Sequence, residues 1–130
     1  IIKLRFADGD LDITPSGLDL SGTTSADILT GDIGDDLIKG LGGNDTLSGS
    51  SGDDEIQGGD GDDTIEGDDG NDTLYGGAGN DTYVINGSED FATDQITDTS
   101  GDKDAIVYTG NGHLRINGFS SNNGIDELCS

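Results

Sequence analysis

An aspartate recurs every nine residues through the middle of this chain. Carboxylates at one fixed spacing can serve as oxygen ligands for a hard divalent cation. They can also be ordinary turn residues, because Asp and Asn are favoured in turns. The strict nine-residue phase favours metal binding over simple turn chemistry. The residues in this phase are Asp27, Asp36, Asp45, Asp54, Asp63, Asp72 and Asp81.

The aspartates occupy position 6 of a nine-residue unit that repeats, without insertion, from residue 22 to residue 84. Position 4 is glycine in every unit except the first, which has Ser25. Recurrent glycine marks backbone that needs a positive φ or the close approach of another segment. Position 1 is always glycine, at Gly22, Gly31, Gly40, Gly49, Gly58, Gly67 and Gly76, and position 8 is always large and apolar, at Leu29, Ile38, Leu47, Ile56, Ile65, Leu74 and Tyr83.

The single apolar residue of each unit predicts a stacked architecture. One inward side chain between two outward ones is a very short strand, so each unit should be a six-residue turn and a three-residue strand. A unit with one apolar anchor cannot bury it alone, but stacked units can build a shared core, as in solenoids. If two units complete one coil, Leu29, Leu47, Ile65 and Tyr83 form one inward column, and Ile38, Ile56 and Leu74 face it.

The composition limits both the core and the partners. The 130 residues carry 28 acidic and 5 basic side chains, for a formal net charge of −23, and only 29% are hydrophobic. Such a chain needs a source of folding free energy besides apolar burial. The charge excludes nucleic acid and anionic lipid as partners, because both are polyanions. No apolar run reaches transmembrane length, so we expect no membrane insertion.

Among the common metals, the residues favour calcium. Aspartates 18 residues apart would lie roughly 5 Å from each other in neighbouring coils, where like charges repel unless a cation separates them. Glycine-rich turns also expose carbonyl oxygens, and Ca²⁺ accepts about six to eight oxygen ligands in flexible geometry. Zn²⁺ would require Cys or His, and the chain has only Cys129 and His113. Mg²⁺ usually retains several waters and suits an all-protein cage poorly.

These units closely resemble the RTX (repeats-in-toxin) nonapeptide GGxGxDxUx, a calcium-binding repeat. The match covers residues 22–84. The resemblance implies an all-β, right-handed parallel β-roll solenoid with non-repetitive, β-rich capping flanks. It also implies an extracellular protein exported by a type I secretion apparatus, a class that includes toxins, proteases, lipases, adhesins and epimerases.

The resemblance further implies which oxygens bind each ion. In the family, one turn supplies its Asp and the carbonyls of positions 2 and 4, and the turn two units later supplies its Asp and the carbonyls of positions 1 and 3. Carried onto this chain, the scheme implies about five ions. The carbonyls are those of Thr23, Ser25, Gly40 and Gly42 for the pair Asp27–Asp45; Asp32, Gly34, Gly49 and Ser51 for Asp36–Asp54; Leu41, Gly43, Gly58 and Asp60 for Asp45–Asp63; Ser50, Gly52, Gly67 and Asp69 for Asp54–Asp72; and Gly59, Gly61, Gly76 and Ala78 for Asp63–Asp81.

Two of the implied sites depart from the family pattern. The first contains Ser25 in place of glycine. A sixth ion would require Asp72 to pair with Asp90, which is in phase, but the turn before Asp90 lacks the glycines.

The flanks are expected to cap the open ends of the solenoid. Residues 1–21 predict a strand, a tight turn and a second strand, and residues 85–130 keep short strand-like segments without the repeat. We therefore expect an N-terminal cap over 1–21, the roll over 22–84 and a C-terminal cap over 85–130.

The principal hypothesis for function is a calcium-binding, non-enzymatic module that folds on Ca²⁺ binding outside the cell, as a monomeric part of a larger secreted protein. An alternative is a ligand-binding or adhesin segment that uses residues 85–130 on the roll as a scaffold. An enzyme fragment is a third class, but no catalytic set of residues stands out. An outward column of Thr46, Thr64 and Thr82 could in principle order water, although short threonine columns are common in strands.

Overall fold

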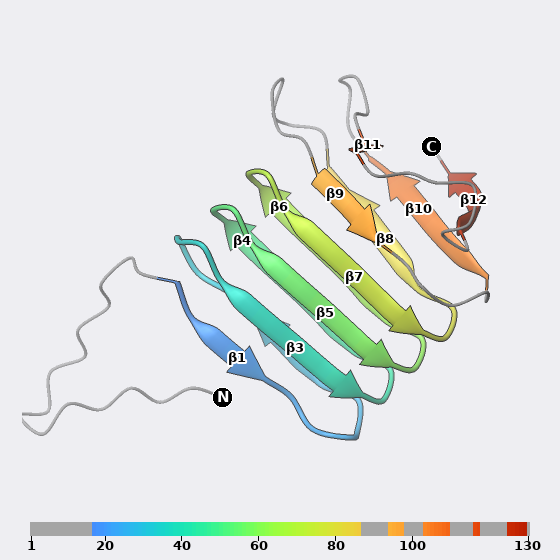
Figure 1. Cartoon of the computed structure of the whole chain (residues 1–130), viewed down its shortest axis with the longest axis horizontal. Coiled ribbons are helices and arrows are strands. Elements are labelled where there is room, and N and C mark those ends of the chain that lie inside the picture. The colour runs from blue at the N-terminus through green and yellow to red at the C-terminus, as the bar shows by residue number, and fades with distance from the viewer. Residues whose placement is uncertain (1–16, 87–93, 98–102, 110–115, 118–124, 130) are drawn as a thin grey trace, which may run out of the picture.

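The chain forms two parallel β-sheets that face each other, as the computed structural model shows (Figure 1). The structure describes residues 17–86, 94–97, 103–109, 116–117 and 125–129. The strands are β1 (Asp19–Ser21), β2 (Ile28–Thr30), β3 (Leu37–Gly42), β4 (Thr46–Ser51), β5 (Glu55–Asp60), β6 (Thr64–Asp69), β7 (Thr73–Ala78), β8 (Thr82–Ile85), β9 (Asp94–Thr97), β10 (Asp104–Tyr108), β11 (Ile116–Asn117) and β12 (Ile125–Cys129).

Consecutive strands alternate between the sheets. One sheet has the order β1-β3-β5-β7-β9-β11 and the other has the order β12-β10-β8-β6-β4-β2. Each strand pairs in parallel with the strand two further along the chain, so two units complete one coil. The predicted all-β parallel β-roll is therefore confirmed.

The strands of the central repeats are longer than the predicted three residues. Each strand from β3 to β7 has six residues and includes the first three positions of the next unit. Leu41 pairs with Gly59, and Gly42 pairs with Asp60, so the ladder continues past the glycine at position 1. The prediction of a six-residue turn was wrong because it ended the strand at that glycine.

The core consists of two facing columns, as the phase of position 8 predicts. In one sheet Leu29 stacks on Leu47, then on Ile65 and Tyr83. In the other sheet Ile38 stacks on Ile56 and then on Leu74. All of these side chains except Leu29 are at most 1% exposed. Columns of buried apolar residues, one from each unit, supply the apolar burial that no single unit could provide.

Both columns extend beyond the nonapeptides. Leu20 of β1 lies against Ile38 at the N-terminal end, Ile96 of β9 follows Leu74, and Ile106 of β10 follows Tyr83. The flanking strands thus join the same two sheets. Residues 1–16 of the strand, turn and second strand predicted over 1–21 lie outside the described residues, as do Asp90 and His113.

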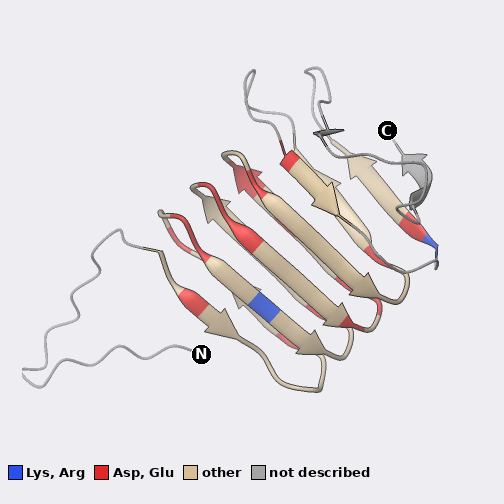
Figure 2. Ribbon diagram, viewed as in Figure 1, with Lys and Arg blue, Asp and Glu red and all other residues tan. Residues whose placement is uncertain are grey.

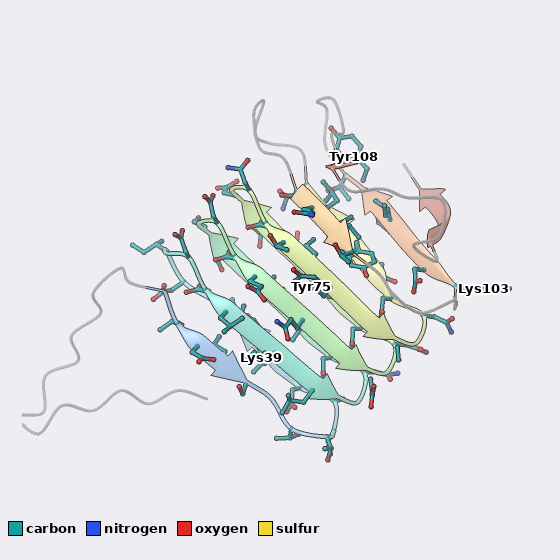
Figure 3. The ribbon with its side chains drawn as sticks, in the orientation of Figure 1. Lys39, Tyr75, Lys103 and Tyr108 are labelled. Atoms are coloured by element: carbon teal, nitrogen blue, oxygen red, sulfur yellow. The ribbon has the colours of Figure 1, made fainter. Side chains whose placement is uncertain are left out.

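The outer faces carry polar side chains. Lys39 and Tyr75 project from the outer face of the sheet that contains β3 and β7 (Figure 3). Thr46, Thr64 and Thr82 align on the other sheet, between Ile28 and Ala105. Acidic residues gather along the turns at both edges of the roll (Figure 2). Within the described part of the chain, no helix is long and apolar enough to cross a membrane.

Candidate metal-binding site

The position 6 aspartates form a ladder along each edge of the roll. From Asp45 to Asp81, the Oδ1 atom of each of these Asp residues accepts the backbone N–H of the Asp one coil earlier. These N–H···O distances are 2.8 Å from Asp27 to Asp45 and from Asp45 to Asp63, 2.7 Å from Asp36 to Asp54, and 2.9 Å from Asp54 to Asp72 and from Asp63 to Asp81. The side chains from Asp36 to Asp81 are at most 2% exposed. The ladder holds every carboxylate in the same orientation.

The second oxygen of four of these carboxylates has no hydrogen-bond partner within the described structure. These are the buried Oδ2 atoms of Asp45, Asp54, Asp63 and Asp72. A buried charged oxygen without a partner is costly, and native proteins satisfy such atoms with a donor or a cation. The described part of the protein therefore gives these four Oδ2 atoms neither a hydrogen-bond donor nor a positive charge, and a bound cation would supply that charge.

The first two units are arranged differently. Oδ2 of Asp27 accepts hydrogen bonds from the backbone N–H and the hydroxyl of Thr23, at 2.5 Å and 2.9 Å. Oδ2 of Asp36 accepts the N–H of Asp32 at 2.8 Å. Position 2 has a positive φ only from the third unit onward, at Leu41, Ser50, Gly59, Asp68 and Gly77. In the first two turns, Oδ2 of the position 6 Asp thus accepts hydrogen bonds from the residue at position 2. In the later turns, Oδ2 of Asp45, Asp54, Asp63 and Asp72 accepts no such bond.

The position 1 glycines leave no space for a side chain, because oxygen atoms lie where the Cβ would be. A Cβ atom on Gly31 would overlap both Oδ2 of Asp36 and the carbonyl oxygen of Gly49. The same two oxygens, one from the unit's own Asp and one from the position 1 glycine one coil later, approach the other glycines of this position up to Gly58, namely Gly22, Gly40, Gly49 and Gly58. A carboxylate oxygen and a carbonyl oxygen therefore converge at each of these five turns.

Positions 2 and 4 bring further carbonyls to the same edges. The carbonyl oxygen of Gly43 points at Gly61 one coil later, and that of Leu41 points at Gly59. The equivalent position 4 carbonyls are those of Gly34, Gly52 and Gly61. The position 3 carbonyls of Ser51, Asp60, Asp69 and Ala78 each accept the N–H of the position 4 glycine one coil earlier, at 2.7–2.9 Å. Each carbonyl retains a second lone pair.

Burial raises the pKa of these carboxyl groups. The pKa of Asp54 and of Asp63 rises to about 6, and that of Asp72 rises to about 7, mainly because burial penalises the charged form. The backbone hydrogen bond to each Asp acts in the opposite direction, and the neighbouring aspartates add to the rise. Without a cation, the ladder is therefore an array of carboxylates that resist ionisation.

The donor set fits a hard oxygen-loving cation. In the described parts of the chain, no group of three or more His, Cys, Asp or Glu side chains could hold a metal by itself. A metal at these turns would bind two carboxylates and several backbone carbonyls, all of them oxygen donors. Calcium accepts such sets readily. The unpartnered Oδ2 atoms and the glycine cradles therefore fit Ca²⁺.

The ladder also contains two aspartates that the repeat phase did not predict. Oδ1 of Asp94 accepts the N–H of Asp72 at 3.2 Å, and Oδ1 of Asp104 accepts the N–H of Asp81 at 2.8 Å. Asp90, the possible partner of Asp72 for a sixth ion, lies outside the described residues; in the ladder the N–H of Asp72 is accepted by Asp94, 22 residues later instead of 18. The sequences Asp-Gln-Ile-Thr and Asp-Ala-Ile-Val, at 94–97 and 104–107, carry the Asp-x-apolar signal that could have identified them.

Comparison with known protein families identifies the repeat. The family model of the RTX calcium-binding nonapeptide repeat matches residues 21–56 and 48–83. Residues 21–83 belong to the RTX calcium-binding repeat family. No curated protein matches it.

RTX repeats bind Ca²⁺, so the cation for this aspartate ladder is calcium. The chain is thus a calcium-binding module of the kind found in RTX proteins, and such repeat rolls are a non-catalytic kind of domain. The alternative ligand-binding surface over residues 85–130 falls largely on residues outside the described ranges and stays a prediction.

Proposed function

We propose that this chain is a module that folds when calcium binds, and that it works outside the cell as part of a larger protein secreted by a type I system. The observation that carries the proposal is the row of buried, unpartnered Oδ2 atoms at Asp45, Asp54, Asp63 and Asp72. A fold that leaves such charges uncompensated should be unstable without a cation. Metal-binding free energy then becomes folding free energy.

The proposed ligands follow the convergence of oxygens at each turn. For the ion between Asp45 and Asp63, they are the two carboxylates with the carbonyls of Leu41, Gly43, Gly58 and Asp60. The support is that Oδ2 of Asp45 and the Gly58 carbonyl already approach the same point beside Gly40. The pairs Asp54–Asp72 and Asp63–Asp81 repeat this arrangement one and two units later. Bound calcium would neutralise the paired carboxylates and satisfy the oxygens that lack donors.

We propose two classes among the five sites. Three begin at an open Oδ2, on Asp45, Asp54 and Asp63. The other two begin at Asp27 and Asp36, whose Oδ2 atoms already accept hydrogen bonds. Calcium must compete with those bonds, so these two ions should bind more weakly.

The proposed setting is a calcium-poor cytosol followed by calcium-rich extracellular fluid. Extracellular calcium modules have dissociation constants of about 10⁻⁴–10⁻³ M. Sites of this class would stay empty in the cytosol, which would keep the chain unfolded for export. The support for this step is membership of the RTX family and the net charge of −23, which opposes collapse without a cation.

The test is a calcium titration of the full chain, followed by far-UV circular dichroism and calorimetry, with magnesium as the control ion. We expect a cooperative gain of β signal near millimolar Ca²⁺ and no comparable gain with Mg²⁺. A β signal already complete in excess chelator would refute calcium-driven folding.

A matched pair of variants tests the ligand scheme. Asp63→Asn removes a charge shared by two proposed sites, so the chain should bind two fewer ions. Asp62→Asn removes the same charge from an exposed neighbour and should leave the ion number unchanged. Equal ion numbers in Asp63→Asn and the wild-type chain would contradict the pairing.

A further inference from the structure

Position 5 of the repeat carries a second ladder of side chains, beside the aspartate ladder at position 6. The residue is Asp or Asn in every unit after the first, and each of these side chains is exposed. Its Oδ1 atom accepts the backbone N–H of the position 5 residue one coil later. The N···O distances are 2.9 Å from Asp53 to Asp35 and from Asn80 to Asp62, and 3.1 Å from Asp62 to Asn44 and from Asn71 to Asp53. None of these side chains is among the proposed calcium ligands.

This second ladder depends on an oxygen acceptor and not on a charge. Asp and Asn occur in it side by side, and both carry an acceptor at Oδ1. The ladder also continues beyond the repeats, where Oδ1 of Asn80 accepts the N–H of Lys103 at 2.9 Å. The first unit is the exception, because Ala26 has no side-chain oxygen to offer the N–H of Asn44.

The two ladders run in opposite directions between the same pair of turns. At position 6, the N–H of Asp45 donates forward to Asp63 at 2.8 Å. At position 5, the N–H of Asp62 donates back to Asn44 at 3.1 Å. The position 5 ladder therefore fixes the direction of a peptide group that the aspartate ladder does not touch.

That peptide group carries a proposed calcium ligand. The N–H of Asp62 and the carbonyl of Gly61 belong to one planar trans peptide, so they point in opposite directions. Because the N–H is held toward Asn44, the carbonyl must point forward, and its oxygen lies where a Cβ on Gly79 would be. This carbonyl is the position 4 ligand proposed for the ion between Asp63 and Asp81.

The same relation applies one unit earlier. Asp35 holds the N–H of Asp53 at 2.9 Å, and the carbonyl of that peptide is Gly52, whose oxygen points at Gly70. Gly52 is the position 4 ligand proposed for the Asp54–Asp72 ion. Each position 5 side chain thus acts on an ion that it does not contact, one coil further along the roll.

We propose that the position 5 side chains are positioning residues for calcium: each holds the N–H one coil later and so orients the position 4 carbonyl that binds the next ion. The inference rests on the proposed calcium-driven function and deepens it. It also identifies one carbonyl without this support, that of Gly43, because Ala26 precedes Asn44 by one coil.

The first test removes one acceptor without changing the charge. In Asn44→Ala, the ion between Asp63 and Asp81 should be released about two- to tenfold faster, which corresponds to the loss of one hydrogen bond. Calcium release is measured by stopped-flow mixing of the calcium-loaded full chain with a chelator. Asn44→Asp retains Oδ1 and should not accelerate release. Wild-type rates in Asn44→Ala, or equal acceleration in both variants, would overturn the proposal.

A double-mutant cycle locates the affected ion. Asp81→Asn removes the Asp63–Asp81 ion, so adding Asn44→Ala should cause no further acceleration of release. Asp27→Asn removes only the proposed ion at the opposite end, so the effect of Asn44→Ala should persist in that background. Equal effects of Asn44→Ala in the two backgrounds would indicate a general loss of stability and would overturn the proposal.

A gain of binding avoids any dependence on weakened variants. Ala26→Asn supplies the missing acceptor for the N–H of Asn44, so the ion between Asp45 and Asp63 should be released about two- to tenfold more slowly. Ala26→Gln is the matched control, because it adds the same amide group one methylene further out and should not slow release. No slowing in Ala26→Asn, or equal slowing in both, would overturn the proposal. If the wild-type chain bound no calcium, the proposed function would fail by itself; calcium binding with wild-type release in all position 5 variants would refute only this inference.

Discussion

Glycine serves two separate physical purposes within one nonapeptide. At position 4 it adopts a positive φ, as at Gly52 with φ of 135°, where a side chain would be strained. At position 1 the obstacle is space, because a Cβ on Gly58 would overlap Oδ2 of Asp63 and the Gly76 carbonyl. Position 1 glycine therefore leaves room for oxygens that converge on the proposed ion.

This distinction predicts a specific effect of Gly58→Ala. The added methyl group should displace two proposed ligand oxygens, so we expect the calcium midpoint to rise and at least one ion to be lost. Gly42→Ala is the matched control, since its Cβ would meet Thr24 and Asp60 at ordinary distances of 3.7 Å and 3.8 Å. Isothermal titration calorimetry of both variants checks the prediction. An equal loss in the two variants would indicate a general backbone effect.

Leu41 is the opposite case, because its backbone has the positive φ that favours glycine but the residue is leucine. It has a φ of 79° and its side chain is 51% exposed. An L-residue in this conformation costs about 1–2 kcal/mol, while glycine costs about 0.5–1 kcal/mol in chain entropy. Leu41→Gly should therefore stabilise the calcium-bound roll by about 0.5–1 kcal/mol in urea unfolding. Leu41→Ala retains the strain and should give no such gain; a similar gain in both would refute the argument.

At the scale of the strand, the sequence predicted the core columns, which depend on the nine-residue phase. It did not predict the ladder residues whose position depends on the length of the connection between strands. The facing columns, from Leu29 to Tyr83 and from Ile38 to Leu74, follow from the nine-residue period. Asp94 and Asp104 were missed because their connections to Asp72 and Asp81 are 22 and 23 residues long. The sequence also identified Tyr83 as a core residue, but a side-chain type does not reveal where its terminal hydroxyl will lie.

Because phase determines strand placement, a deletion should be tolerated when it removes a whole unit. Deleting residues 49–57 joins two intact units, so the chain should still fold with calcium and bind one ion fewer. Deleting residues 49–53 removes a turn and breaks the phase, so we expect little calcium-dependent gain of β signal. Circular dichroism and calorimetry compare the two deletions. Equal damage from both would show that the roll depends on features of the individual unit.

For the molecule as a whole, protons and calcium should act as alternative partners of the same carboxylates. The pKa values of Asp54, Asp63 and Asp72 are about 6, 6 and 7 in the metal-free fold, against 3.8 for an ordinary Asp. The folded state thus binds protons more tightly than the unfolded state does. This contribution to stability is fully present below about pH 4 and is lost as the pH rises through about 6 to 7.

In calcium-free buffer, the β signal should therefore increase as the pH falls from 7.5 to 5. The titration stops at pH 5 because solubility decreases near the sequence pI of about 4.1. In calcium, the trend should reverse, because ligands must be deprotonated to bind a metal and the calcium midpoint should rise as the pH falls. Asp72→Asn removes the group with the highest of the three pKa values, so it should weaken the acid-induced gain. A calcium-free β signal that is unchanged over this range would mean that the buried carboxylates do not limit folding, and the net charge of the whole chain would then be the barrier that calcium overcomes.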